Sequence, residues 1–275
     1  MLKISHIDIG TKRLEIGWYG PPPDETLTLV FLHEGLGCVD MWRDFPVRLA
    51  SATGCGAMLY SRLGYGRSDA CALPRPVRFM HEEGLNILPK LLDRTGIEEC
   101  IIVGHSDGGS IGLIYAGGTP ALPLRGLITE AAHVFCEERT IKSIQEARNR
   151  YVKGDLKKKL EKYHGLNTDC AFWGWNDVWL DPDFKHWNLE EYLPGIQVPV
   201  LALQGEEDAY GSALQLETIL KHSAGKTTPL MLPKCGHSPH IDCSEATLQA
   251  MKGFILRTCQ NSKRISRQAS ARTCR

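Results

Sequence analysis

A short apolar run that ends in a glycine-flanked serine constrains the fold of this chain most. Residues 101–103 are Ile-Ile-Val, and residues 104–108 read Gly-His-Ser-Asp-Gly before a helix-like stretch begins at Gly109. A strand that turns sharply into a helix strains the backbone at the serine, and glycines on both sides leave room for this turn. The free N–H groups of the helix N-terminus then face any negative charge that develops at the Ser106 hydroxyl. The segment therefore predicts a serine nucleophile on a strand-to-helix elbow.

Strand-like and helix-like stretches alternate on both sides of this elbow. A hairpin is expected first, and the alternation that follows predicts βαβ units and hence an α/β fold with a mainly parallel sheet and helices on both faces. The expected strands are 2–9, 14–19, 27–32, 56–60, 100–103, 124–130, 200–205 and 229–232. The expected helices of this pattern are 42–51, 77–94, 109–116, 212–222 and 245–257.

The alternation stops between residues 133 and 194. A charged helical region, 137–163, is followed by a stretch, 172–187, that contains four of the six tryptophans. We interpret residues 133–194 as a helical cap inserted into a core domain that consists of residues 1–132 and 195–260. Dense tryptophans are compatible with an apolar pocket roof, so we expect Trp173, Trp175 and Trp179 to contact a bound substrate.

Composition and charge exclude several classes of function. The chain has 32 Lys and Arg against 32 Asp and Glu, so no overall field attracts nucleic acid or an anionic membrane, and we expect a small-molecule partner. No apolar run approaches the roughly 20 residues of a membrane span, and residues 1–10 lack the apolar core of a secretory signal, which predicts a cytoplasmic location. The sequence leaves the oligomeric state open, a homodimer included.

The cysteines and the C-terminal residues add two further expectations. Ten cysteines are scattered without a CxxC pair, so we expect reduced thiols and no zinc site, and we expect no other metal or organic cofactor. Residues 261–275 carry five basic and no acidic side chains with little apolar content. This composition predicts a basic, disordered tail.

A serine hydroxyl is a poor nucleophile at neutral pH and needs a general base together with a group that orients the base. In the expected chain order the acid follows the serine, and the loop after the strand 200–205 has three adjacent acids, Glu206, Glu207 and Asp208. We choose Asp208, with the two glutamates as alternatives. The base is expected after the last strand, where His237 follows a glycine and His240 is the second choice.

A glycine-rich loop directly after the strand 27–32 completes the constellation. It reads His-Glu-Gly-Leu-Gly from His33 to Gly37. Backbone N–H groups of Gly35 and Leu36 are candidates for an oxyanion hole, together with the N–H of Asp107 directly after the serine. His33 is expected to brace this loop by hydrogen bonding or to border the substrate pocket.

These four pieces, in this order and spacing, resemble the α/β-hydrolase superfamily over residues 1–258. A further segment, 62–68, reads Arg-Leu-Gly-Tyr-Gly-Arg-Ser and is similar to the RxGxGxS loop after the fourth strand in many members. The resemblance implies an eight-stranded, mostly parallel sheet, a triad of Ser106, Asp208 and His237, and a helical lid over the triad. It does not give the substrate, because the fold hosts many chemistries.

The residues favour a serine hydrolase that cleaves a small acyl compound, most simply a carboxylic ester, through an acyl-enzyme. Family members with Asp at the elbow form alkyl-enzyme esters, which the serine at position 106 disfavours. Three alternatives stay open: hydrolysis of the carbon–carbon bond of meta-cleavage products, cofactor-free perhydrolysis, and binding of a small ligand without turnover.

Overall fold

A single twisted sheet organises the structure, a computed structural model that describes residues 2–118, 120 and 123–273. Its eight strands lie in the order β1-β2-β4-β3-β5-β6-β7-β8. β1 and β2 form the predicted antiparallel hairpin, β2 also runs antiparallel to β4, and all other neighbours are parallel. The strands are Lys3–Ile9 (β1), Lys12–Tyr19 (β2), Thr28–Leu32 (β3), Gly56–Tyr60 (β4), Cys100–His105 (β5), Leu124–Glu130 (β6), Val200–Gly205 (β7) and Thr227–Leu232 (β8). The predicted α/β class is confirmed.

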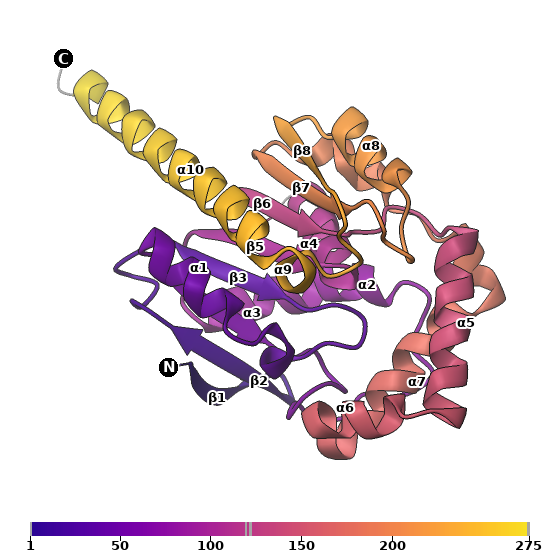
Figure 1. Ribbon diagram of the computed structural model, residues 1–275. Coiled ribbons are helices and arrows are strands. Elements are labelled where there is room, and N and C mark those ends of the chain that lie inside the picture. Colours follow the sequence, from indigo (N-terminus) through magenta and orange to yellow (C-terminus); the bar gives the residue numbers. More distant parts are fainter. Residues whose placement is uncertain (1, 119, 121–122, 274–275) are drawn as a thin grey trace.

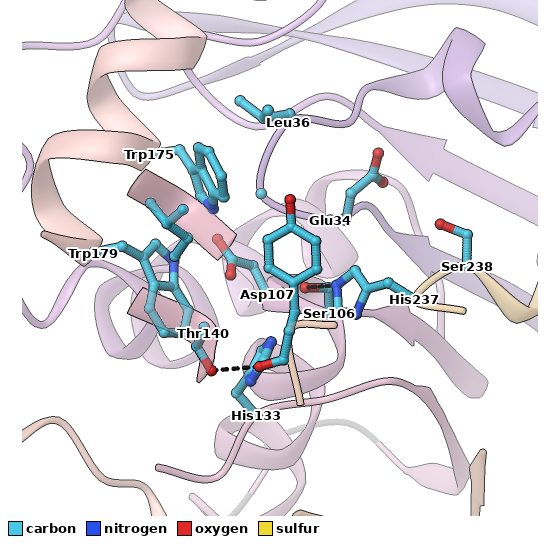
Figure 2. A pocket seen from close by; sticks show the side chains of 13 residues that line it. Glu34, Leu36, Ser106, Asp107, His133, Thr140, Trp175, Trp179, His237 and Ser238 are labelled. Atoms are coloured by element: carbon cyan, nitrogen blue, oxygen red, sulfur yellow. Dashed lines mark hydrogen bonds between the residues drawn. The ribbon is translucent and has the colours of Figure 1, made fainter. Parts of the chain in front are cut away.

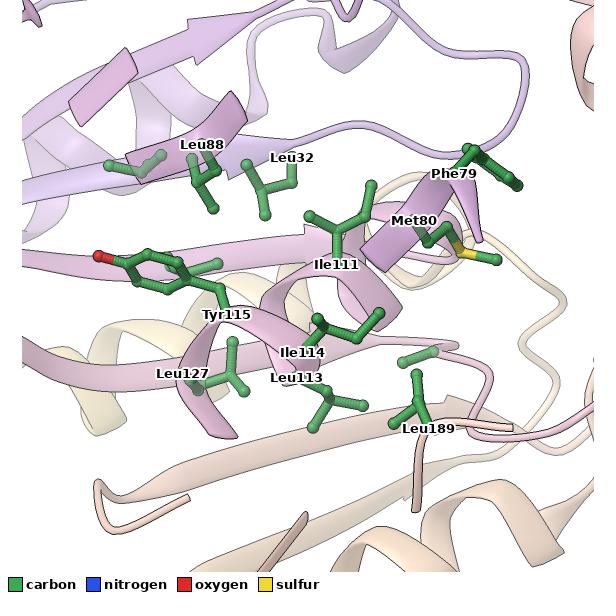
Figure 3. Packing of buried hydrophobic residues seen from close by; sticks show 14 of the residues in the cluster. Leu32, Phe79, Met80, Leu88, Ile111, Leu113, Ile114, Tyr115, Leu127 and Leu189 are labelled. Atoms are coloured by element: carbon green, nitrogen blue, oxygen red, sulfur yellow. The ribbon is translucent and has the colours of Figure 1, made fainter. Parts of the chain in front are cut away.

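The central strands are buried on both faces because helices cover each side of the sheet. In β5, Ile102 belongs to one core cluster, whereas its neighbours Ile101 and Val103 belong to the other, as the two-residue period of a strand requires. The first cluster is covered by α3 (Leu88–Arg94), α4 (Asp107–Gly117) and α8 (Ala213–His222), and the second by α1 (Phe45–Thr53) and α10 (Ser244–Thr273). Figure 3 shows α4 residues packed between the sheet and neighbouring side chains. The sheet is thus held in place by two separate hydrophobic cores, one on each face.

Three helices lie beyond the carboxyl ends of the strands, in the region predicted to be a cap. They are α5 (Glu138–Lys153), α6 (Leu156–His164) and α7 (Thr168–Trp179), and Figure 1 shows them set apart from the sheet. The charged stretch predicted as one helical region divides at Gly154, which adopts an extended conformation between α5 and α6. The 3₁₀ turns η3 (Gly165–Asn167), η4 (Pro182–His186) and η5 (Glu190–Gly195) complete the route to β7. Core and cap as separate domains stay a prediction.

The helix predicted over residues 77–94 is divided into three pieces. α2 (Phe79–Glu82) passes into a π-helical turn, η2 (Glu83–Ile87), and then into α3. Pro89 lies in the first turn of α3, where it has no N–H to donate to the preceding turn, and this favours an interruption there. Two short elements near the site, η1 (Val39–Trp42) and α9 (Pro239–Asp242), were not predicted.

The chain after Asn261 differs from the disordered tail that we predicted. α10 continues as helix to Thr273, and Figure 1 shows its end projecting beyond the sheet; residues 274 and 275 lie outside the described residues. The sequence from 254 onward contains no glycine or proline, and it is rich in Arg, Gln, Ala and Ser, so nothing in it breaks a helix.

Two further observations concern the described residues only. No helix among them is both long and apolar enough to cross a membrane. No disulfide joins the nine cysteines among them, and the tenth, Cys274, lies outside the described residues.

We expect the packing of β6 against α4 to contribute strongly to stability. Leu127 is fully buried, and a Cβ placed on Gly112 of α4 would lie 3.0 Å from its Cδ1. Leu127→Ala should lower the free energy of unfolding by about 3–5 kcal/mol, because the cavity cannot collapse between a strand and a helix. Urea denaturation measures this change. Leu214→Ala, on the exposed face of α8, is the matched control and should cost less than about 1 kcal/mol; equal losses would contradict the packing argument.

Candidate active site

Ser106 occupies a strained turn between β5 and α4. Its φ is +52°, which is unusual for a residue other than glycine and costs on the order of 1–3 kcal/mol. The turn is held because the Ser106 N–H donates to the Glu130 carbonyl of β6 at 2.8 Å. A Cβ on Gly108 would lie 2.0 Å from the Leu32 carbonyl oxygen, so this position requires glycine. The predicted elbow geometry is therefore present, with the serine at the N-terminus of α4.

The structure brings Ser106, His237 and Asp208 into one hydrogen-bonded chain. The Ser106 Oγ lies 2.9 Å from His237 Nε2, and His237 Nδ1 lies 2.9 Å from both carboxylate oxygens of Asp208. With Nδ1 protonated, the imidazole donates to Asp208 and accepts from the serine hydroxyl. Figure 2 shows the contact between the serine and the histidine at the floor of a pocket. This tautomer is the one that general-base catalysis needs.

Asp208 differs from the two neighbouring acids in its burial. Its side chain is fully buried, whereas Glu206 and Glu207 are exposed. The Gln204 side chain donates to Asp208 at 2.6 Å, and the backbone N–H of Tyr210 donates at 2.8 Å. Burial alone would raise the pKa of Asp208, but hydrogen bonds from His237 and from the Tyr210 backbone outweigh it and lower that pKa below its usual value. Asp208 is thus placed as an ionised acceptor at neutral pH.

The alternative base, His240, has a different partner. It follows His237 by three residues in α9, and its ring and backbone N–H contact the buried carboxylate of Glu130 at 3.0 and 2.9 Å. Burial would raise the pKa of Glu130, but the contact with His240 lowers it. Among the described residues, no hydrogen bond joins His240 to Ser106. His240 anchors the loop that carries His237.

The glycine-rich loop after β3 is fixed from beneath by one buried arginine. The Arg62 guanidinium donates to the carbonyls of His33 and Glu34 at 2.5 and 2.8 Å, and the Arg62 backbone N–H donates to the His33 ring at 3.0 Å. His33 is fully buried and does not border the pocket. Its hydrogen bonds brace the loop, which is the first of the two roles considered for it. Gly35 and Leu36 do border the pocket, together with Ser106 and Asp107.

A second ion pair connects this loop to the base. The Glu34 carboxylate lies 3.6 Å from His105 Nδ1, and His105 Nε2 lies 2.7 Å from the backbone carbonyl of His237. Burial lowers the pKa of His105, but Glu34 outweighs it and raises that pKa to about 9. His105 is therefore doubly protonated at neutral pH: it donates from Nε2 to the His237 carbonyl and forms an ion pair with Glu34 through Nδ1. The residue before the nucleophile thus holds the two flanking loops together.

The pocket above Ser106 has a volume of about 210 Å³, room for roughly seven water molecules at ~30 Å³ each. Of the three tryptophans expected to contact a substrate, Trp175 and Trp179 of α7 line the pocket, whereas Trp173 packs on Tyr151 and Phe172. The remaining lining residues are Glu34, Gly35, Leu36, Ser106, Asp107, His133, Thr140, Ile144, Tyr210, His237 and Ser238. The site is therefore suited to a small group.

Sequence reasoning missed two aromatic side chains of this pocket. Tyr210 lies two residues after Asp208, and its ring packs 4.6 Å from that of His237. His133 follows β6, the neighbour of β5, so its position at the carboxyl edge of a parallel sheet is a signal that could have found it. Burial lowers the pKa of His133 to about 4, and this residue is neutral at pH 7.

The described residues contain no group of three or more His, Cys, Asp or Glu side chains that could hold a metal ion. The acidic and imidazole groups near Ser106 instead pair with one another, as His237 does with Asp208 and His105 with Glu34.

Comparisons with known proteins agree with this architecture. A profile of the alpha/beta hydrolase family matches residues 29–250. No curated protein sequence matches the chain. Similar solved structures include a proline iminopeptidase of Mycobacterium smegmatis, with 17% identity, a TM-score of 0.71 and coverage of 94% of this chain and 100% of that one. An esterase from Exiguobacterium antarcticum has 17% identity, a TM-score of 0.70 and coverage of 89% and 96%. An enol-lactonase from Burkholderia xenovorans has 17% identity, a TM-score of 0.70 and coverage of 91% and 99%.

The pair of Glu34 and His105 should make stability depend on pH. The His105 pKa of about 9 exceeds the ~6.5 of an unfolded histidine, so its stabilisation is complete below pH ~6.5 and is lost as pH rises through 9. The pKa of Glu34 is lowered by His105 against the raising effect of burial, so its contribution is complete above its unfolded pKa of ~4.3. The pair therefore stabilises most between about pH 4.5 and 6.5.

The urea midpoint of the wild type should accordingly exceed that of Glu34→Gln at pH 6, and the difference should shrink towards pH 10. Glu206→Gln, an exposed carboxylate, serves as the control and should follow the wild type at every pH. A difference for Glu34→Gln that stays constant from pH 6 to 10 would show that the two side chains do not form the pair.

Proposed function

The chain belongs to the alpha/beta hydrolase family, and we propose that it is a serine hydrolase that cleaves a small acyl compound, in the simplest case a carboxylic ester, through an acyl-enzyme. The observation that carries this proposal is the unbroken contact from Ser106 Oγ to His237 Nε2 and from His237 Nδ1 to the Asp208 carboxylate. The esterase and enol-lactonase among the similar structures support hydrolysis of an ester-type bond.

Acylation follows from this geometry. His237 accepts the proton of Ser106 as Oγ attacks the acyl carbonyl carbon, and the carbonyl oxygen becomes an oxyanion. The N–H of Asp107 is the first of α4 and has no acceptor within that helix, so it is available to the oxyanion, together with the N–H of Gly35 or Leu36 in the neighbouring loop. Each such donor is worth roughly 10²–10³ in rate.

Collapse of the tetrahedral intermediate breaks the bond to the leaving group. His237 gives its proton to the departing alcohol oxygen, which leaves an ester between the acyl group and Ser106. A water molecule then loses a proton to the same histidine and attacks the acyl carbon. The bond from that carbon to Ser106 Oγ breaks, His237 returns the proton to Oγ, and the carboxylic acid is released. Asp208 stays ionised throughout and stabilises the imidazolium. Its lowered pKa is consistent with this role: burial would raise that pKa, but the hydrogen bond from His237 lowers it more than any other contact does.

The pocket supports a small acyl group. The side chains of Trp175, Trp179, Thr140 and Ile144 line the pocket from the region of α5 and α7, and the free volume of about 210 Å³ is shared by the acyl and leaving groups.

Ser106→Ala should lower kcat by a factor of roughly 10⁴–10⁶, because no other group can form the acyl-enzyme. We would measure the p-nitrophenol burst with short and medium p-nitrophenyl esters for the wild type and this variant together. Circular dichroism of the variant controls for folding. Undiminished turnover in Ser106→Ala would exclude the proposed nucleophile, and a wild type inert to both the esters and a fluorophosphonate would favour a ligand-binding role.

Asp208→Asn should lower kcat by about 10⁴, since the amide no longer holds the imidazole in the tautomer that accepts from the serine. Glu206→Gln and Glu207→Gln remove exposed carboxylates from the same loop and should leave kcat within about twofold of the wild type. Steady-state kinetics of the three variants distinguish the acids. A large loss in either glutamate variant with normal Asp208→Asn activity would reassign the triad acid.

A further inference from the structure

The Asp107 carboxylate is buried in the pocket with an unused hydrogen-bonding atom. Asp107 is 1% exposed, and its Oδ2 has no hydrogen-bond partner among the described residues. It also forms no ion pair with the described cations. Figure 2 shows this carboxylate facing the same space as Ser106 and the indole of Trp175. A buried carboxylate without a full set of partners is costly, which indicates that a ligand supplies the missing partner.

The charged groups near the Asp107 carboxylate differ between the protein interior and the pocket. Burial raises the pKa of Asp107 to about 6, because it outweighs the lowering effects of Arg62, the Trp179 indole N–H, His237 and Arg75. The hydrogen bonds of both guanidinium groups go to backbone carbonyls of the loops beneath the pocket, at residues 33, 34 and 63. Asp107 is therefore mostly ionised at pH 7, with no direct counter-ion.

The pocket side offers no positive charge to an acyl group. The lining residues, all within the described part of the chain, include the carboxylates of Glu34 and Asp107 but neither Lys nor Arg. His133 is neutral at pH 7, since burial lowers its pKa to about 4. The rings of Trp175, Trp179 and Tyr210 line the remaining wall. Carboxylate and indole faces together are the groups that bind ammonium ions in proteins.

We propose that the pocket accepts acyl groups that carry a protonated amine next to the carbonyl, such as amino-acid esters or amides, with the ammonium on Asp107 and against the indole rings of α7. The charge lies close to the carbonyl because Asp107 directly follows the nucleophile, and its own N–H faces the oxyanion. Acyl groups with a carboxylate at the same place are disfavoured, because that carboxylate and the Asp107 carboxylate repel each other. This inference rests on the proposed function and narrows its substrate class.

The test compares three benzyl esters of similar shape at pH 7: those of L-alanine, isobutyric acid and methylmalonic acid, with an ammonium, a methyl and a carboxylate on the α-carbon. An α-amine with a pKa of ~7.7 is mostly protonated at this pH. We expect kcat/KM to be at least about tenfold higher for the alanine ester than for the isobutyrate ester, and lowest for the methylmalonate ester. The preference should fall below pH 6, where Asp107 takes up a proton, and above pH 8, where the amine loses one.

Asp107→Asn retains the shape and the backbone N–H of this residue but removes its charge. The ratio of kcat/KM for the alanine and isobutyrate esters should fall to about one or below in this variant, whatever happens to the absolute rates. Glu206→Gln, which removes an exposed carboxylate near the site, should retain the wild-type ratio. A wild-type preference for the isobutyrate ester, or a ratio unchanged in Asp107→Asn, would overturn the inference and leave the serine mechanism intact.

A binding measurement separates this inference from the catalytic proposal. Calorimetry with Ser106→Ala should show tighter binding of L-alaninamide than of isobutyramide, with the difference lost when Asp107→Asn is added. Equal binding of the two amides would overturn the inference even if the wild type labels with a fluorophosphonate. Absence of labelling together with absence of ester turnover would instead remove the proposed function itself.

Discussion

The backbone turn at Ser106 is the constraint on which the site depends. A residue with a side chain adopts a positive φ there only because β5, β6 and α4 all hold it: β6 accepts its N–H, and Gly108 packs against the end of β3 at Leu32. The same packing places the loop that contains Gly35 beside the start of α4. The strain is maintained by the two cores on either side of the sheet, since a loosely packed sheet would let the turn relax.

Two pairs of histidine and carboxylate complete the frame around His237. Glu34 with His105 joins the loop after β3 to the carbonyl of His237, and Glu130 with His240 anchors the helix that follows His237. Each pair joins residues from different parts of the chain, so neither loop can move without breaking its contact. The imidazole of the base is thereby positioned on both sides by groups that take no part in proton transfer.

The sequence was sufficient for the order of the strands along the chain and for the serine, because both are encoded locally. The continuous apolar runs of β3 and β5 and the glycines around Ser106 are signals contained within a few residues. The acid is different, since Asp208 is distinguished from its two neighbours only by burial, which depends on the whole fold. His133 and Tyr210 reach the pocket through the packing of distant segments, which spacing does not encode. The helical continuation of α10 shows the same limit for composition.

The contact between Gly35 and Trp175 has a consequence for how this fold can be modified. A Cβ on Gly35 would lie 2.1 Å from the indole Nε1, so the loop after β3 and helix α7 are fitted to each other at atomic distance. The predicted cap is therefore not an exchangeable module. A chimera that carries another family member's cap would leave a void above Gly35 or meet it with a clash, and successful recombination would have to transfer the loop after β3 together with the cap.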